Sequence, residues 1–303
     1  MKNCKCIFCG GETKYIYKLN GYDILQCEKC FTSFVDKMPS DAELETYYKG
    51  FKFCINEDNK KKILKDDFRK WFSSFNLPHN AKMLDIGGGG GFFSLAFQKF
   101  GFGDATYIDL DPDSCKYAES QNISNVFNSD VSDLLAKDEQ KFDFIYSRHL
   151  IEHLVNPIKI IDIAIDLLSD DGVFLLQFPN GLSYERLVDK DHYQNRQNLL
   201  VASNHLFSKF RIFRILHSNK TAFGLDPIRH LWAISPKGIY EYLKTKNVDF
   251  TIKTYGIDDK IYSPYFYEKK YFAKSLFRAI FSLFNGKCHL VVQIKKKKLS
   301  NFR

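Results

Sequence analysis

The chain has 303 residues, 45% of them hydrophobic, and its formal charge of +8 comes from residues 253–303, where twelve Lys and Arg face three Asp and Glu. This length suits one large domain with a small appendage, and a solvated basic end explains such a tail more simply than attraction to phosphate, nucleic acid or lipid. No stretch approaches the roughly 18 to 20 apolar residues of a spanning helix, and the first residues lack a signal peptide's apolar run, so we expect a cytoplasmic protein.

Residues 1–38 contain two cysteine pairs, Cys6-x-x-Cys9 and, after seventeen residues, Cys27-x-x-Cys30. In a reducing compartment such pairs indicate a metal site and not disulfides. Two tight turns that face each other supply four thiolates in a tetrahedron, the arrangement of structural Zn²⁺, which leaves no position for substrate. We therefore predict a small zinc-ribbon-like module of short strands; four unconnected cysteines are the alternative. The other cysteines are expected to be ordinary ones: Cys4, Cys54, Cys115 and Cys288.

Residues 39–79 are predicted to form a helical connection. Ser40 is a plausible N-cap for a helix that continues through Tyr47 and Tyr48. A second helix over 58–75 places its apolar and aromatic residues at helical spacing, so it should pack against the domain that follows.

From residue 81 onward, short apolar runs alternate with helical segments of about ten residues, a pattern that predicts parallel strands joined by crossover helices. We expect an α/β fold over 80–303: a Rossmann-like, doubly wound, mostly parallel seven-stranded sheet with helices on both faces. A substrate-side insertion is expected at about 182–235, and the two closing strands suit an antiparallel edge. The expected strands are 83–87, 105–110, 125–130, 142–147, 172–180, 249–256 and 288–295, and the expected helices are 91–100, 112–120, 157–168 and 235–244.

A glycine-rich turn lies where the first of these strands ends and the first helix begins. Glycines there let a ligand approach the backbone closely, and the helix N-terminus adds N–H donors. A nicotinamide-type G-x-G-x-x-G is not matched, because Phe92 and Phe93 occupy the place of its third glycine. Asp109 ends the next strand, where a carboxylate can bind both ribose hydroxyls. The alternative pattern D-x-G-x-G-x-G is complete in Asp85, Gly87, Gly89 and Gly91.

The segments MLDIGGGGGFF, YIDLDPDSCKYAE, NSDVSDL, KFDFIYSRHLIEHLVNP and LLSDDGVFLLQFPN follow one another over about residues 81–180, and in them the sequence resembles the class I S-adenosylmethionine-dependent methyltransferases. The cysteine pairs with SDAELETYY, and the later DPIRHLWAISPKGIYEYL, resemble sugar methyltransferases of this class that carry an N-terminal zinc-binding domain.

The resemblance implies that S-adenosylmethionine is the cofactor. It places Asp109 and the neighbouring Leu110 at the ribose end, and the glycine turn near Asp85 at the methionyl end together with Ser147. The adenine would be bound by the Asp130 carboxylate and the Val131 amide, although a helix cap is the alternative role of Asp130.

A histidine is the expected general base, because a neutral hydroxyl is a poor nucleophile and must lose its proton as it attacks. His149 directly follows a strand end, at a position that faces the cofactor's methyl group in this fold, and is the first candidate. His230 and His205 lie in the substrate-side segments and are the alternatives. His153 is expected to have a packing or helix-end role.

The predicted function is methyl transfer to a small polar acceptor, with a nucleotide-activated sugar or another surface-glycan precursor as the first candidate. The alternatives are an RNA methyltransferase, against which no recognised RNA-binding pattern is present, and a catalytically silent cofactor-binding or assembly protein. The amphipathic segment 271–284 should pack on the sheet, with weak peripheral membrane contact as the alternative. No oligomeric state is predicted.

Overall fold

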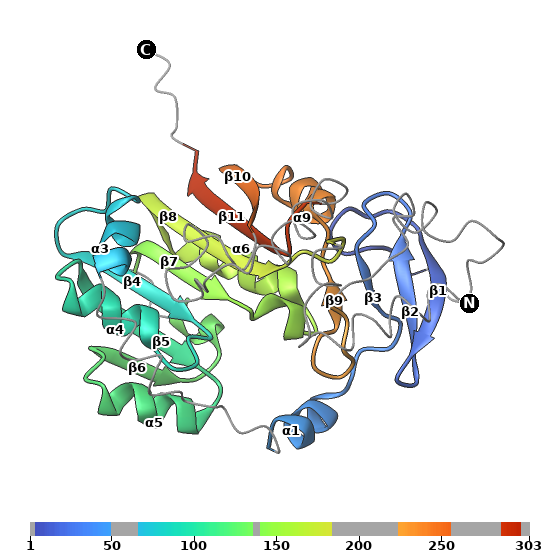
Figure 1. Cartoon of the computed structure of the whole chain (residues 1–303), viewed down its shortest axis with the longest axis horizontal. Helices are drawn as coiled ribbons and strands as arrows, with labels where there is room; N and C mark the ends of the chain where they lie inside the picture. The colour runs from blue at the N-terminus through green and yellow to red at the C-terminus, as the bar shows by residue number, and fades with distance from the viewer. Residues whose placement is uncertain (1–3, 50–65, 136–139, 184–223, 256–285, 298–303) are drawn as a thin grey trace, which may run out of the picture.

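The computed structural model describes residues 4–49, 66–135, 140–183, 224–255 and 286–297. These residues form a four-stranded sheet near the N-terminus and a seven-stranded sheet that is the centre of the larger part of the molecule (Figure 1). Most of the insertion predicted at 182–235, the amphipathic segment 271–284 and Cys54 lie outside the described residues.

The large sheet has the strand order β10-β11-β8-β7-β4-β5-β6. All its neighbouring pairs are parallel except those of β11, which runs antiparallel to both β8 and β10. This confirms the doubly wound sheet with an antiparallel edge. In chain order the strands are β4 (Ala81–Ile86), β5 (Gly103–Asp109), β6 (Asn125–Asn128), β7 (Phe142–Arg148), β8 (Leu168–Pro179), β10 (Val248–Tyr255) and β11 (His289–Lys296).

Helices cover both faces of this sheet, as predicted. Alternate residues of a strand point to opposite faces, so Met83 of β4 belongs to the apolar cluster that includes α3 and α4, whereas Leu84 belongs to the cluster that includes α6 and α9. Each of the helices α5, α6 and α9 begins with a side-chain cap followed by proline, a sequence signal that fixed their starts. The helices are α3 (Asp66–Ser73), α4 (Phe92–Lys99), α5 (Pro112–Ser120), α6 (Pro157–Leu167) and α9 (Pro236–Leu243).

A separate helix, α1 (Asp41–Lys49), begins where the sequence predicts it. The Glu43 amide donates to the Ser40 hydroxyl at 3.4 Å, and the Ser40 amide donates to the Glu43 carboxylate at 2.8 Å. This reciprocal pair is a capping box, which satisfies two N–H groups at the helix start.

The small sheet combines three N-terminal strands with one strand from a distant part of the chain. Its order is β1-β2-β3-β9, and β9 comes from some two hundred residues after β3. Ser33 pairs with Ala233 and Phe34 with Trp232. A two-residue strand has no hydrophobic period, so the sequence does not indicate it. The strands are β1 (Thr13–Leu19), β2 (Tyr22–Cys27), β3 (Ser33–Val35) and β9 (Trp232–Ala233).

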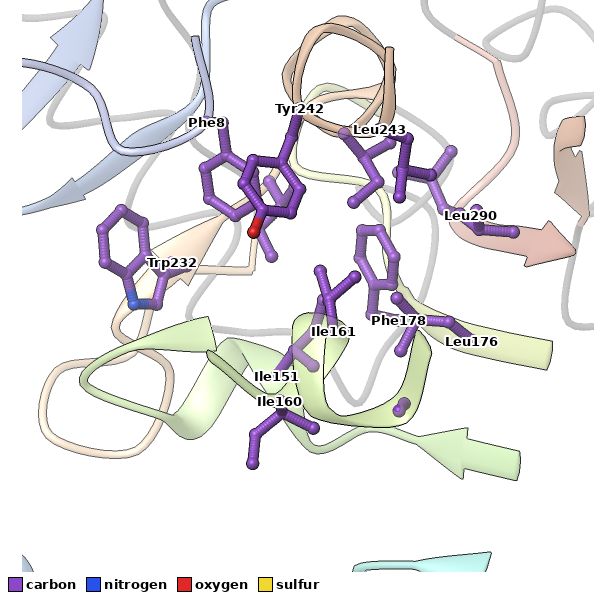
Figure 2. Close-up of a cluster of buried hydrophobic side chains, with 14 of the residues drawn as sticks. Phe8, Ile151, Ile160, Ile161, Leu176, Phe178, Trp232, Tyr242, Leu243 and Leu290 are labelled. Carbon is purple, nitrogen blue, oxygen red and sulfur yellow. The ribbon is translucent and has the colours of Figure 1, made fainter. Parts of the chain in front are cut away.

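One continuous apolar cluster joins the small sheet to the large one (Figure 2). Trp232 packs against Phe34 at a ring-centroid distance of 4.8 Å and against Phe8 at 5.8 Å. Its indole N–H donates to the Leu154 carbonyl at 2.8 Å, on the side of the large sheet. The small sheet is therefore fixed to the larger part by burial of apolar surface, and Trp232 contacts both.

No helix among the described residues is long and apolar enough to cross a membrane.

Replacing Trp232 should destabilise the protein strongly. We expect Trp232→Ala to lower the free energy of unfolding by about 3–5 kcal/mol, because it leaves a cavity between the two sheets and an unpaired Leu154 carbonyl. Denaturant unfolding followed by circular dichroism measures this. Tyr240→Ala, at a side chain that is 46% exposed on α9, is the control and should cost less than about 1 kcal/mol. Equal effects of the two variants would contradict the assignment of Trp232 as the connecting residue.

Candidate functional site

The glycine turn follows β4 directly at the carboxyl edge of the sheet. Gly87, Gly89 and Gly91 have φ angles of +66°, +53° and +63°, in the left-handed region that favours glycine. There is also no room for side chains: a Cβ on Gly88 would lie 2.6 Å from the Tyr107 ring. The turn therefore presents backbone without side chains at the start of α4.

Asp109, at the end of β5, is held against this turn. Its carboxylate accepts hydrogen bonds from the Gly89 amide at 3.0 Å and the Asp111 amide at 2.9 Å, and the Tyr107 hydroxyl lies 3.3 Å from it. Burial raises the pKa of Asp109, and the hydrogen bonds from the Asp111 and Gly89 amides oppose that rise. The next residue, Leu110, is 67% exposed, so an apolar surface lies open beside a fixed carboxylate.

Asp85 is buried beneath the turn, where its carboxylate accepts a hydrogen bond from the Ser94 hydroxyl at 2.8 Å. Burial raises its pKa to about 7; the Ser94 hydrogen bond opposes the rise and the nearby Asp109 charge adds to it. Burial thus destabilises the ionised form of Asp85, and the Ser94 hydrogen bond fixes the position of its carboxyl group.

The other predicted cofactor residues lie at the ends of neighbouring strands. Asp130 precedes the short 3₁₀ helix η1 (Val131–Leu134) and caps it, since its carboxylate accepts the Ser132 amide at 2.8 Å. The predicted cap is therefore present, and it occupies one carboxylate oxygen. Burial would raise the pKa of Asp130, but the hydrogen bonds from Ser132 lower it on balance. Val131 is buried.

Ser147, in β7, lies opposite Ile86, the last residue of β4. Its side chain is fully buried, and its hydroxyl has no hydrogen-bond partner within the described part of the chain. A buried hydroxyl without a partner is costly, so this is a place where a polar ligand group would be stabilising. The glycine turn lies at the same edge of the sheet.

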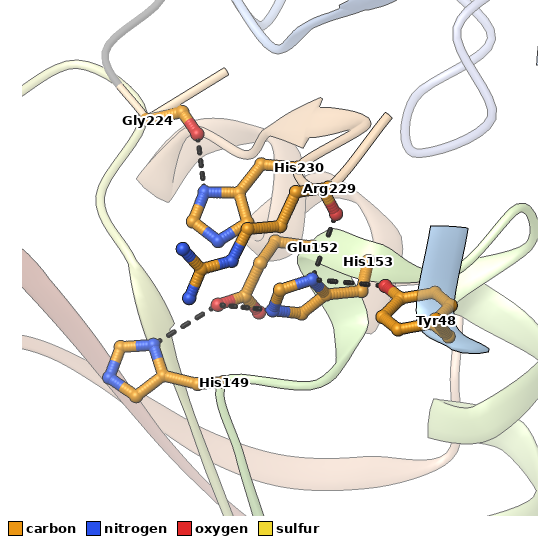
Figure 3. A network of polar contacts seen from close by, with 7 residues as sticks. All are labelled: Tyr48, His149, Glu152, His153, Gly224, Arg229 and His230. Atoms are coloured by element: carbon orange, nitrogen blue, oxygen red, sulfur yellow. Dashed lines mark hydrogen bonds and ion pairs between the residues drawn. The ribbon is translucent and has the colours of Figure 1, made fainter. Parts of the chain in front are cut away.

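His149 leaves the end of β7 with a φ of +49°, and its amide donates to the Gln177 carbonyl at 2.9 Å. Its ring is about one third exposed (34%), and its Nδ1 lies 3.0 Å from Oε1 of Glu152. Glu152 lies in the 3₁₀ turn η2 (Ile151–His153) and is buried (Figure 3). The sequence analysis did not single out Glu152; the available signal was a charged residue within the apolar segment LIEHL.

His153 and His230 lie on the other side of Glu152 from His149 (Figure 3). Their rings are 4.6 Å apart and nearly perpendicular. Burial would raise the pKa of Glu152, but the hydrogen bond from His149 and the nearby histidines lower it to about 2. Burial, together with His153, lowers the pKa of His230 to about 3. The structure thus brings His149 and His230 to one carboxylate, whereas His205 lies outside the described residues.

The four predicted cysteines come together in the small sheet. Their sulfur atoms lie within 4.8 Å of one another, with 3.7 Å between Cys6 and Cys30 and 3.4 Å between Cys9 and Cys27. Four thiolates at about 2.3 Å from a tetrahedral ion are about 3.8 Å apart, so the spacing fits such a site. A Cβ on Gly11 would lie 2.9 Å from the Cys27 sulfur, which explains the glycine after the first pair. Cys4 is exposed and lies outside the cluster.

The raised pKa of Asp85 predicts a pH-dependent stability. A carboxyl group whose pKa is higher in the folded state contributes stability at low pH that is lost as the pH rises through the folded value. Relative to wild type, Asp85→Asn should therefore gain up to about 4 kcal/mol between pH 4 and pH 8 in the absence of ligand. Denaturant unfolding across this pH range measures the gain. Asp104→Asn, at an exposed position on β5, is the control and should run parallel to wild type; a parallel curve for Asp85→Asn would contradict the prediction.

Comparisons with known proteins identify the family of the chain. A family model described as a methyltransferase domain matches residues 57–231. The ubiquinone biosynthesis O-methyltransferase of Xanthomonas campestris pv. campestris (strain B100) is 32% identical over 105 residues, 33% of this chain and 44% of that protein. The corresponding protein of Psychrobacter arcticus is 32% identical over 138 residues, 43% of this chain and 52% of its own length. The chain thus spans about half the length of these curated relatives, or less.

Solved structures of low sequence identity are also similar. A plantazolicin methyltransferase in complex with SAH has 13% identity and a TM-score of 0.45, and covers 86% of this chain and 91% of its own. An S-adenosylmethionine-dependent methyltransferase from Clostridium acetobutylicum has 16% identity and a TM-score of 0.48, with 84% and 98% covered. Since the family match extends over more than half of the chain, the protein belongs to the methyltransferase domain family, as a class I S-adenosylmethionine-dependent member.

Proposed function

We propose that the protein transfers the methyl group of S-adenosylmethionine to a hydroxyl of a small polar acceptor. The observation that carries the proposal is the junction of β4 and β5, where Asp109 is fixed by the Gly89 amide beside an open glycine turn. A carboxylate at the end of the second parallel strand suits a ribose, and the turn suits a ligand that must approach the backbone.

The cofactor contacts proposed from the sequence fit this edge. Asp109 has acceptor positions left for the ribose hydroxyls, because a carboxylate offers about four and the Gly89 and Asp111 amides use two of them. The Tyr107 hydroxyl has one proton, and its nearer acceptor is the Gly89 carbonyl at 2.7 Å. The exposed Leu110 would pack on the adenine, beside the Asp130 carboxylate and the Val131 amide. The buried hydroxyl of Ser147 would form a hydrogen bond with the methionyl end of the cofactor. Asp85 would orient the turn formed by Gly87, Gly89 and Gly91.

His149 is the proposed general base. The Glu152 carboxylate accepts the proton on Nδ1, so Nε2 is the basic nitrogen of this tautomer and would take the acceptor's proton. The sulfonium supplies an already activated leaving group, so the protein contributes position and proton removal. His230 is less suited to this role, since its ring is largely buried and its low pKa makes it a weak base.

The cysteine cluster is proposed to hold a structural Zn²⁺. Four thiolates close the coordination sphere, so the ion would stabilise the small sheet and take no part in the chemistry. The proposed division of the chain is a zinc-binding module at 1–38, a helical connection at 39–79 and a methyltransferase domain at 80–303. Because β9 belongs to the last of these and pairs with β3, the module's order would support the segment that carries His230.

The proposed acceptor is a nucleotide-activated sugar or another surface-glycan precursor. It is supported by the joining of a cysteine-rich module to this core, the combination in which the sequence resembles sugar methyltransferases. A dihydroxyaromatic acceptor is the second candidate, because the curated relatives carry the name ubiquinone biosynthesis O-methyltransferase.

Asp109→Asn should weaken cofactor binding. Loss of the charge and of one of the two acceptor oxygens should reduce the affinity for S-adenosylhomocysteine about 10-fold or more, measured by calorimetry. Asp104→Asn changes the same residue type at the opposite end of β5 and should bind as wild type does. Full affinity in Asp109→Asn, or no binding by the wild-type protein, would reject the proposed cofactor site.

Removing a cluster cysteine should release the metal. We expect Cys30→Ser to purify with less than one zinc per chain and with a lowered thermal unfolding midpoint, because one of four ligands is lost. Metal analysis by mass spectrometry and a thermal scan measure both effects. Cys4→Ser, at the exposed cysteine outside the cluster, should retain zinc and stability. A wild-type protein that purifies without zinc would contradict the proposal.

The acceptor is tested by incubating the protein with cofactor carrying a labelled methyl group and panels of nucleotide sugars, dihydroxyaromatic compounds and RNA transcripts. We expect label in a sugar, and a kcat reduced about 100-fold or more in His149→Gln with unchanged cofactor affinity. Transfer to an aromatic compound or to RNA would reject the sugar. Cofactor binding without transfer to any acceptor would favour a silent protein.

A further inference from the structure

The side chains of Glu152, His153 and His230 converge on one point. Each contributes a ligand atom, and these atoms lie within 4.8 Å of one another. Oε1 of Glu152 bonds to His149, but Oε2 is buried and has no hydrogen-bond partner within the described residues. An ionised oxygen in that position is expensive to bury, and a cation would compensate for it.

The two histidines are oriented in the manner of metal ligands. Nδ1 of His153 lies 2.8 Å from the Arg229 carbonyl, and Nδ1 of His230 lies 2.7 Å from the Gly224 carbonyl (Figure 3). A carbonyl oxygen only accepts, so the proton of each ring is on Nδ1 and the lone pair is on Nε2. A backbone carbonyl bonded to the outer nitrogen is the common second contact of a metal-binding histidine.

We propose that Glu152, His153 and His230 bind a divalent transition-metal ion. Two imidazoles and one carboxylate suit Zn²⁺, Fe²⁺ or Co²⁺ and leave further positions open. Nε2 of His153 lies 3.9 Å from Oε1 of Glu152, whereas ligand atoms around a tetrahedral ion are about 3.4 Å apart. Binding therefore requires a contraction of about half an ångström or more, which side-chain rotation provides.

The coordination positions that the protein leaves open on the ion would be available to oxygen ligands such as an acceptor hydroxyl. Because Glu152 joins this site to His149, an acceptor hydroxyl bound there would lie near the proposed base. Metal binding can be tested separately from the proposed function, since the metal ligands include none of the proposed cofactor contacts and the test needs no turnover.

A neighbouring positive charge predicts the direction in which one substitution changes the metal affinity. The Arg229 guanidinium lies close to Glu152 and His230 in Figure 3 and would repel a dication. If the metal occupies this cluster, Arg229→Gln should bind it as tightly as the wild-type protein or more tightly, because the substitution keeps the carbonyl that orients His153.

Cobalt distinguishes this site from the cysteine cluster. Full-length protein, loaded with one zinc per chain and dialysed, is titrated with Co²⁺. We expect a weak visible absorption without thiolate charge-transfer bands, saturating at one cobalt per chain. Glu152→Gln and His153→Gln should each weaken binding more than about 10-fold. His79→Gln, at an exposed histidine, is the matched control and should bind as wild type does.

Circular dichroism confirms that each variant is folded; if Glu152→Gln does not fold, the partly exposed His153 provides the decisive variant. Binding lost in His153→Gln and kept in His79→Gln supports the proposal. No cobalt binding by the wild-type protein, binding unchanged in His153→Gln, or binding lost in Arg229→Gln would overturn it.

Discussion

The buried carboxylate of Glu152 is the constraint on which the proposed acceptor side of the site depends. A charge can be buried only where other groups compensate for it. Here the His149 ring hydrogen-bonds to Oε1, and a bound cation would compensate for Oε2. The backbone carbonyl of Glu152 also accepts the Leu231 amide at 2.8 Å. Glu152 thus connects η2 to Leu231, the residue that precedes β9.

That junction also explains why a cysteine-rich module adjoins the large sheet. The Leu231 carbonyl accepts the Val35 amide at 3.2 Å, and the Ser235 hydroxyl donates to the Cys30 carbonyl. The segment 231–235 therefore bonds to β3 on one side and to η2 on the other. The small sheet is thus connected by backbone hydrogen bonds to Leu231, the residue that follows His230.

Local sequence signals predicted most of the fold. Ser40 with Glu43, and the cap-proline pairs before α5, α6 and α9, act within one helical turn and can be recognised from a few residues. The strand β9 could not be predicted in this way, since two residues carry no period. The contact between His153 and His230 also escaped, because it joins positions 77 residues apart that only the fold brings together.

The proposed cofactor side and the proposed acceptor side differ in the same way: local sequence signals predict the first, and long-range contacts form the second. The proposed cofactor side is built from consecutive strand ends between Asp85 and Ser147, so the parallel topology places these residues along one edge of the sheet. The proposed acceptor side is assembled from η2 and from residues after Gly224, through buried charge and long-range hydrogen bonds. Family membership constrains the first arrangement and leaves the second free to vary, because methyl transfer requires one cofactor geometry and accepts many nucleophiles. Acceptor specificity in this protein is therefore to be sought around Glu152 and not around the glycine turn.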